Sequence, residues 1–359
     1  MVLFFCKMSA KPFPQRVFAK GFTMVEMLVS ITVLAMVVIL TFQVVSHTSA
    51  LWLSSSAKLT SFEIATAGFD MMTRKISQAT LNTYWDYEPK PGPANWFPPP
   101  PTAYVRASEL HFCVASGSAL LSSTNATSHA IFFQAPLGYT TTYGKTPNFA
   151  PLVGMINTVG YYIAYTPQKS LPSFLNATPT WRYRLYEMLE PSEQFRGYSE
   201  IDVLTRKFYE TQDWFATNRE LTSRKIADNV IGLIIRARYP DPQNPEEYVE
   251  TYMYDSGDNT AYYRADGQRV PTAIQKIPTY NQLPPTVSVT MIVMDENSAK
   301  RLGDDYHKVT QPVNTFIKTE NFEEDLKTWT DNLSSMRPQV TFRIYTANIA
   351  IREAKWSSN

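Results

Sequence analysis

The feature that most constrains this chain is an apolar segment, Phe22–Val45, whose one formally charged side chain is Glu26. At a rise of about 1.5 Å per residue, a helix of this length crosses the roughly 30 Å hydrocarbon core of a bilayer. We therefore expect residues 22–45 to form a transmembrane helix. Whatever follows must fold as a domain tethered at its N-terminal end.

The segment before this run is basic. Residues 1–21 contain no Asp or Glu, and their cations are Lys7, Lys11, Arg16 and Lys20. Basic flanks stay on the cytoplasmic side of a membrane, so the bulk of the chain should lie outside. An ordinary signal peptide has a shorter apolar region and is cut after that region, so the mature protein does not keep it. Such a signal peptide and an uncleaved signal anchor are the two alternatives to a leader that is cut before the helix.

The junction between the basic and apolar parts is GFTMVEMLVSI, residues 21–31. It resembles the class III leader junction of type IV prepilins and of type II secretion pseudopilins. The resemblance implies that residues 1–21 are a leader peptide and that a prepilin peptidase cuts between Gly21 and Phe22 on the cytoplasmic side. The helix would then remain in the mature protein, with Glu26 as its fifth residue.

The carboxylate of Glu26 needs a partner on physical grounds. A charged side chain in a membrane helix costs about 2.5–3.5 kcal/mol on insertion scales, so it marks a functional pairing by default. The resemblance implies that Glu26 faces the freed amine of Phe22 on a neighbouring subunit. Because residues four apart share a helix face, pairing with the amine of its own chain is the alternative. Phe22 and Glu26 are thus the expected assembly residues.

Charge and cysteine content argue against several classes of function. The formal net charge is +1 over 359 residues, which gives no reason to expect nucleic-acid binding. The cysteines are Cys6, inside the leader, and Cys113. The mature chain would keep one thiol, so we expect neither an internal disulfide nor a cysteine-based zinc site. The remaining length suffices for a buried core.

Three segments are expected after the membrane helix. Residues 46–84 should continue it as an amphipathic arm, because apolar side chains recur at helical intervals. Gly68 weakens the arm and predicts a bend there. Residues 85–104 are rich in proline and predict an extended, rigid connector rather than a ligand for a proline-reading domain. Residues 105–359 should form a β-rich globular domain. The apolar stripe of the arm comprises Leu59, Phe62, Phe69, Met72 and Ile76.

The globular part shows short aromatic and β-branched runs separated by turn residues, a pattern typical of antiparallel sheets. Val230–Tyr239 is the most hydrophobic run and should be central. Helices are expected at 202–217, 221–229 and, with Phe322, Leu326, Trp329 and Leu333 on one face, at 320–333. The other expected strands are Glu109–Val114, His129–Gln134, Gly160–Thr166, Trp181–Met188, Tyr248–Tyr254, Val287–Met294 and Phe342–Ile351.

The succession YYIAYTP, WRYRLYEM, ADNVIGLIIRARY, QLPPTVSVTMIVM and FRIYTANIAIREAKW extends the resemblance. It is similar to that of J-type minor pseudopilins and related minor pilins, although the proline segment and the helix at 320–333 look like additions. The resemblance implies an α+β fold, with a long N-terminal helix on a C-terminal antiparallel β-rich domain. It also implies insertion in a bacterial inner membrane with a single span and a periplasmic C-terminal domain.

A search for catalytic or ligand-binding patterns gives little. No metal-binding histidine spacing, P-loop, G-x-G-x-x-G or G-x-S-x-G motif is present. His111 and His129 fall in expected strands, where a satisfied or exposed histidine is the simpler interpretation. Asp255, Asp258 and Asn259 can offer oxygens to calcium, but a plain turn is favoured. We therefore expect no catalytic residue, metal site or cofactor. Arginines for DNA contact exist but are not favoured, namely Arg236, Arg238, Arg343 and Arg352.

The sequence thus predicts a minor pseudopilin that initiates or caps a short pilus-like filament of a type II secretion-like system. Its partners would be the prepilin peptidase, other major and minor pseudopilins, the inner-membrane assembly platform and the lipid bilayer. Two alternatives stay open, namely a minor pilin of a type IV pilus or DNA-uptake system, and a membrane-anchored exported enzyme or binding domain.

Overall fold

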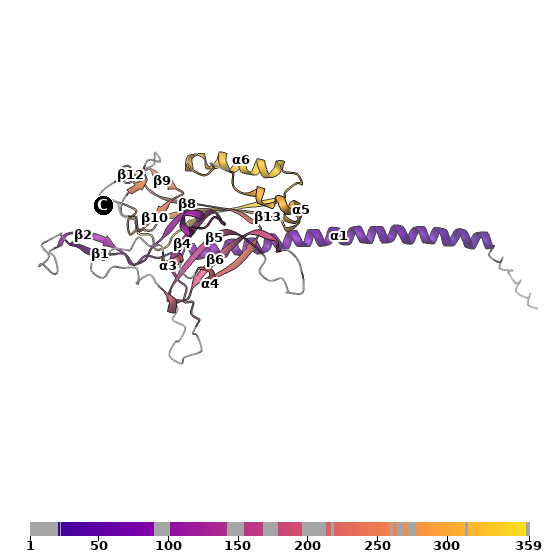
Figure 1. Ribbon diagram of the computed structural model, residues 1–359, viewed down its shortest axis with the longest axis horizontal. Coiled ribbons are helices and arrows are strands. Elements are labelled where there is room, and N and C mark those ends of the chain that lie inside the picture. Colours follow the sequence, from indigo (N-terminus) through magenta and orange to yellow (C-terminus); the bar gives the residue numbers. More distant parts are fainter. Residues whose placement is uncertain are drawn as a thin grey trace, which may run out of the picture. The chain divides into compact units, whose positions relative to one another are not determined.

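The computed structural model describes residues 21, 23–89, 101–141, 154–167, 179–195, 213–216, 219–258, 261–263, 269–271, 278–312 and 315–356. Two compact units divide the chain, Met1–Ser55 and Ser56–Asn359. Helix α1 (Met24–Ile76) runs through the boundary between them. Figure 1 shows α1 in indigo, followed by the strands and helices of the second unit.

In the first unit, the described residues from Met24 onward are all helical, and all of them except Ser54 are exposed. Their length and composition are sufficient for a membrane span. Polar side chains within the apolar run and just after it bond back to the helix itself. The hydroxyl of Ser30 donates to the Glu26 carbonyl at 2.7 Å, and those of Thr41 and Thr48 donate to the carbonyls of Val37 and Val44. Such bonds leave few polar groups that would need water in a bilayer.

In the second unit, the rest of α1 buries one face. Phe62, Ala65, Phe69, Met72 and Ile76 recur at three- and four-residue intervals and are buried. The expected stripe is therefore correct from Phe62 onward, but Leu59 is 57% exposed and does not belong to it. The burial begins about one turn later than predicted.

Gly68 does not interrupt α1, contrary to the predicted weak point. A Cβ atom at this position would lie 2.6 Å from Cγ2 of Ile226, which is far inside van der Waals contact. The glycine therefore serves close packing between the helix and the strand that contains Ile226. The loss of helix propensity is offset by this contact.

The helix ends at Ile76, not near Asn82 as predicted. The amide N–H of Gln78 donates to the Lys75 carbonyl in a tightened last turn. The amide of Thr80 then donates to the Gln134 carbonyl at 2.9 Å. The chain thus leaves the helix by bonding to a strand, a tertiary contact that helical periodicity does not reveal.

The proline-rich segment is not a single extended connector at its described ends. β1 (Tyr84–Pro89) and β2 (Pro101–Ala107) pair antiparallel, with Tyr84 opposite Ala107 and Pro89 opposite Pro101. The structure replaces the expected extended connector by a two-stranded ribbon at these ends, in which strand pairing satisfies backbone groups on both sides of the proline-rich stretch. Residues 90–100 lie outside the described part.

The larger sheet has, within the described residues, the order β10-β3-β4-β5-β6-β7, with antiparallel neighbours. Its strands are β3 (Cys113–Ser116), β4 (Ala126–Pro136), β5 (Ile156–Pro167), β6 (Trp181–Glu190), β7 (Ser223–Asp228) and β10 (Tyr254–Asp255).

The second sheet has the order β14-β13-β8-β9, again antiparallel. Its strands are β8 (Val230–Pro240), β9 (Tyr248–Thr251), β13 (Thr286–Met294) and β14 (Phe342–Ala350). β8 lies inside the sheet, as its hydrophobicity predicted. A separate described pair is β11 (Ala261–Tyr263) with β12 (Arg269–Pro271).

The two sheets are joined at an irregularity in β4. The register of β4 against β5 shifts between Thr127 and Ile131, and Ser128 there has a φ of 62°. The hydroxyl of Ser128 donates to the Leu233 carbonyl at 2.6 Å and accepts from the Leu233 amide at 3.0 Å. At this bulge Ser128 and His129 of β4 bond to the backbone of β8 in the other sheet.

Helices cover the second sheet near its C-terminal strands. α5 (Glu296–Leu302) follows β13, and α6 (Phe322–Ser335) buries Phe322, Trp329 and Leu333, three of the four residues predicted for its face. Gly232 of β8 admits Trp329, because a Cβ atom there would lie 2.3 Å from its ring. Figure 1 shows α6 beside β8 and β13. Short helical turns are η1 (Ser192–Gln194), η3 (Gly303–Val309) and η4 (Thr319–Asn321).

Three local predictions were wrong. Residues 221–229, expected to be helical, form mostly strand β7, after a short helix α4 (Arg219–Thr222). The expected strand at 248–254 is two strands in different sheets, because Thr251 Oγ1 bonds both backbone groups of Met253 and turns the chain. β3 begins at Cys113 rather than at Glu109. Of the helix expected at 202–217, only α3 (Asp213–Ala216) is described.

The larger sheet has two different faces. One packs against the second sheet and the buried stripe of α1 in the main core. The other carries a smaller cluster around Phe132 and Met188, which also contains α3 side chains Trp214 and Phe215 and residues of α2 (Gly117–Leu121). At the β6 and β7 end, the residues of this second face are mainly polar and charged.

Candidate functional site

The start of α1 is the first candidate site. Thr23 precedes the helix, and its Oγ1 accepts the amide N–H of Glu26 at 3.2 Å. This is the side-chain bond of an N-cap, in the T-x-x-E spacing of a capping box. This spacing is visible in the sequence and could have pointed to Thr23 as the N-cap. Gly21 is described and exposed, whereas Phe22 lies outside the described residues.

The side chain of Glu26 is exposed. Among the described residues, no hydrogen bond or ion pair reaches its carboxylate. It lies in the first turn of α1, where the helix dipole favours a negative charge. Its role in pairing with the amine of Phe22 stays a prediction. The carboxylate would be available to a cation supplied from outside the described chain.

The second notable cluster attaches the end of α1 to the larger sheet. Glu187 of β6 is fully buried, and its Oε1 accepts from Lys75 Nζ at 2.7 Å and from the Tyr161 hydroxyl at 2.5 Å. Its Oε2 accepts from Arg224 Nε at 2.7 Å. The Glu187 carboxylate thus accepts hydrogen bonds from α1, β5 and β7, and through Lys75 it holds the end of α1 against the sheet.

The pKa values of this cluster follow from its geometry. Burial by itself raises the pKa of Glu187, but the hydrogen bonds from Lys75 and Tyr161 and the charges of Lys75 and Arg224 outweigh it and hold the pKa below its ordinary value. Burial, and next the Glu187 charge, raise the pKa of Tyr161. The carboxylate is thus ionised at neutral pH and the phenol is a hydrogen-bond donor.

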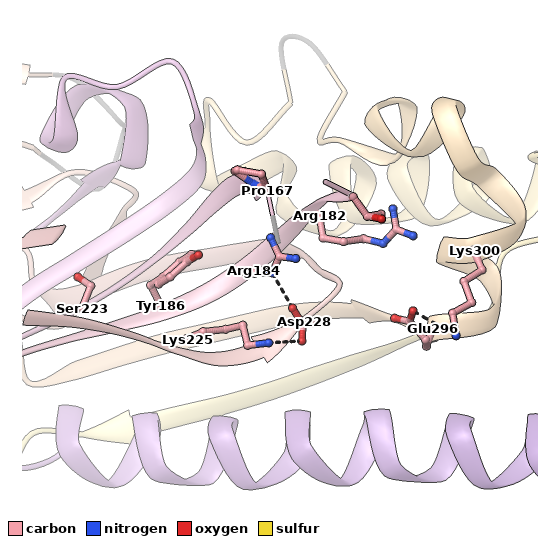
Figure 2. Close-up of a pocket in the computed structure, with 10 residues that line it drawn as sticks. Pro167, Arg182, Arg184, Tyr186, Ser223, Lys225, Asp228, Glu296 and Lys300 are labelled. Carbon is pink, nitrogen blue, oxygen red and sulfur yellow. Dashed lines mark hydrogen bonds and ion pairs between the residues drawn. The ribbon is translucent and has the colours of Figure 1, made fainter. Parts of the chain in front are cut away.

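The third site is a basic groove of about 630 Å³ (Figure 2), which the sequence analysis did not predict. Arg184 and Lys225 each pair with Asp228 at 2.7 Å. Arg182 lies toward the end of the groove where Glu296 and Lys300 are found. The lining is completed by polar residues and a proline. In full, the lining residues are Pro167, Thr180, Arg182, Arg184, Tyr186, Ser223, Lys225, Asp228, Glu296 and Lys300.

The histidines considered as candidate ligands have structural partners. His129 is buried, and its Nδ1 accepts the amide N–H of Ile235 at 3.1 Å. Burial lowers the pKa of His129 to about 4, so its ring is neutral. His111 contacts the Asp255 carboxylate, and its ring lies 5.4 Å from that of Trp214. Asp255 also accepts the Gly257 amide at 2.8 Å, in the turn predicted here.

Three of the four arginines that could contact DNA are used within the fold. Arg236 pairs with Glu250 at 2.8 Å, and Arg238 and Arg343 lie over the rings of Tyr248 and Phe62. Among the residues that the structure describes, no group of three or more His, Cys, Asp or Glu side chains could hold a metal ion.

The comparisons with known proteins concern mainly the N-terminal segment. The family model described as the prokaryotic N-terminal methylation motif matches residues 18–42. No curated protein sequence matches the chain. Among solved structures, a type IV-like pilin from Thermus thermophilus aligns at 5% identity over 82% of this chain and 97% of that one. Its TM-score is 0.30, too low to carry an argument about fold. The motif match supports a type IV pilin-like protein.

Proposed function

We propose that this protein is a minor pseudopilin, a structural subunit that initiates or caps a short pilus-like filament of a type II secretion-like system. A prepilin peptidase would remove residues 1–21. The mature chain would sit in the bacterial inner membrane by one span, with its β-rich unit in the periplasm. Its partners would be other pseudopilins and the inner-membrane assembly platform.

The observation that supports the proposal most directly is the methylation motif at residues 18–42, which contains Gly21, Phe22 and Glu26. The physical setting agrees with it. The part of α1 that lies in the first unit exposes apolar side chains along its length. The Glu26 carboxylate has no partner among the described residues. Both features call for a surrounding that supplies apolar contacts and a cation.

Assembly would satisfy both needs. A helix leaves a bilayer only if its apolar surface finds equivalent burial, and a bundle of similar helices from neighbouring subunits provides it. The α-amine of a neighbouring subunit would neutralise Glu26 in that bundle. The C-terminal part of α1 packs on the β-rich unit through Phe69 and through the Lys75–Glu187 ion pair, so the chain that leaves the membrane would carry this unit with it.

The same N-terminal chemistry would serve a minor pilin of a type IV pilus or uptake system. Neighbouring genes distinguish the two. Several further short leaders with Gly-Phe junctions beside a secretin and an assembly ATPase would favour secretion. A membrane-anchored enzyme or binding domain is distinguished by its N-terminus, which would not begin at Phe22.

The proposal predicts that Glu26→Ala leaves membrane insertion and leader removal intact but abolishes or strongly reduces co-purification with partner subunits. The reason is that the variant loses the carboxylate that would pair with a neighbour's α-amine. The measurement is affinity capture of the full chain from detergent extracts, with partner subunits identified by mass spectrometry.

Glu63→Ala is the matched control, because Glu63 is an exposed carboxylate on the same helix. It should capture partners as the natural chain does. Undiminished capture by Glu26→Ala would count against the pairing, and equal loss in both variants would indicate a general effect of charge.

A further inference from the structure

The basic groove lies on the face of the larger sheet that turns away from α1. Alternate residues of a strand point to opposite faces. On β6, Tyr183 and Leu185 belong to the main core and Glu187 reaches α1. Arg182, Arg184 and Tyr186 line the groove instead. Figure 2 shows them with Ser223 and Lys225 of the adjacent strand β7.

The groove carries more positive than negative charge. Its lining contains four cationic side chains, Arg182, Arg184, Lys225 and Lys300, against the carboxylates of Asp228 and Glu296. Asp228 is shared by two cations. Lys300 and Glu296 are 3.7 Å apart on α5, with the Lys300 side chain 67% exposed. Such an exposed pair is weak, which leaves the ammonium available to a ligand.

Arg182 is the cation with the least compensation. Its Nη1 donates to the Trp181 carbonyl at 3.0 Å, and its guanidinium lies 4.6 Å from the centre of the Tyr306 ring. No carboxylate among the described residues pairs with it. The ring and the carbonyl fix the fork of the guanidinium in place, and a fixed guanidinium is well suited to bind a carboxylate or phosphate.

The rest of the lining favours a peptide over a nucleic acid. Tyr186 stacks on Tyr162 with ring centres 5.5 Å apart, so one of its faces is not available to a base. The two groove carboxylates would repel a continuous phosphate backbone, whereas peptide N–H groups can donate to them. The volume of about 630 Å³ exceeds what a single inorganic anion needs.

β7 offers a strand along which such a peptide could lie. It is the last strand of the larger sheet within the described residues. An extended segment that lies along a terminal strand gains main-chain hydrogen bonds, and its alternate side chains reach the same face of the sheet. We propose that the basic groove binds an extended, acidic segment of a partner protein, whose carboxylates pair with Arg182 and Lys300.

The test is direct binding of synthetic peptides to the full chain in micelles of an uncharged detergent. The probes are a fluorescent ten-residue peptide of alternating Glu and Thr, the matching Lys and Thr peptide, a ten-residue oligodeoxythymidine and inorganic phosphate. We expect binding of the Glu-Thr peptide alone, weakening as salt rises because the attraction is between exposed charges. The measurement is fluorescence anisotropy.

The variants Arg182→Glu and Lys300→Glu, combined, turn the surplus of positive charge into an equal surplus of negative charge. We expect the dissociation constant for the Glu-Thr peptide to rise at least about tenfold. Lys300→Glu alone is on the exposed surface and should fold, with a smaller rise in the same direction. Lys327→Glu, an exposed lysine of α6, is the control with the same charge change and should leave binding within about twofold.

Each other outcome overturns the proposal. One is no binding of the Glu-Thr peptide at concentrations up to about 1 mM, which corresponds to a free energy of only about −4 kcal/mol. Another is binding that the Lys327 control weakens as much as the groove variants do. Tighter binding of the oligodeoxythymidine would assign the groove to nucleic acid. Full competition by millimolar phosphate would assign it to a simple anion.

Discussion

Glu187→Ala is expected to lower the free energy of unfolding of the β-rich unit by about 3–5 kcal/mol. The substitution removes a fully buried carboxylate and leaves the ammonium of Lys75, 16% exposed, and the buried hydroxyl of Tyr161 without their acceptor. Loss of a charge partner in such a place costs far more than loss of a surface pair. The end of α1 would lose its ionic attachment to β6.

The measurement is urea unfolding of the full chain in micelles, followed by near-ultraviolet circular dichroism of the buried aromatic residues. Asp305→Ala is the matched control. The Asp305–Lys308 pair has nearly the same separation, 2.8 Å, but both side chains are more than half exposed. Its removal should leave the unfolding midpoint unchanged. Equal midpoints for Glu187→Ala and the natural chain would refute the proposed attachment.

The effect of Glu187 should also depend on pH in a defined direction. Its folded-state pKa is held below the unfolded value. The ionised carboxylate therefore contributes stability above the unfolded pKa, and this is lost as the pH falls through the folded pKa. We expect the stability difference between the natural chain and Glu187→Gln to shrink as the pH falls through that value.

Acidification from pH 7 to pH 4 is expected to destabilise the natural chain by about 3 kcal/mol more than a His129→Asn variant. Burial lowers the pKa of His129 from 6.5 to about 4, and one pKa unit corresponds to about 1.4 kcal/mol. Because the unfolded chain binds the extra proton, stability is complete above pH 6.5. It is lost progressively as the pH falls toward 4.

His129→Asn is a suitable reference, because its amide oxygen can accept the Ile235 N–H that Nδ1 accepts at 3.1 Å and does not titrate. Carboxylates that titrate in the same range are common to both proteins and cancel in the difference. Urea unfolding at steps of half a pH unit gives the two curves. Parallel curves between pH 6.5 and pH 4 would show that the ring of His129 is not buried in its neutral form.

Much of the fold could be predicted where a segment is long and its pattern is local. The α+β class, with a long N-terminal helix and antiparallel sheets, is what the structure shows. β8 was expected to be central from the run VIGLIIRARY, and the buried face of α6 from the spacing of Phe322, Trp329 and Leu333. In each case the burial is set by periodicity within the segment itself.

Predictions failed where a distant residue decides the local structure. The sequence SRKIAD has no strong strand pattern, yet β7 pairs with β6, where Arg224 reaches Glu187 and Asp228 pairs with Arg184. The helix α1 ends early because Thr80 bonds to β4. By sequence alone Gly68 predicts a weak point in the helix, because Ile226, its close neighbour in space, is far away in the sequence.

The candidate sites divide in the same way. Gly21, Phe22 and Glu26 are predicted from one contiguous string, and the N-cap bond of Thr23 could be predicted from the T-x-x-E spacing in the same string. The basic groove could not, because Arg182, Lys225 and Lys300 come from β6, β7 and α5, which are far apart in the sequence and come together only in the folded chain. Likewise, nothing near Lys75 in the sequence indicates that its partner is Glu187.

The central claim is that the leader is cut before the apolar helix and the helix stays in the mature protein. The most direct test is the N-terminal residue and intact mass of the protein extracted from membranes of cells that contain a prepilin peptidase. We expect a chain that begins at Phe22, with one methyl group on its amine. A chain that still begins at Met1, or one that begins beyond Val45, would contradict the proposed filament subunit.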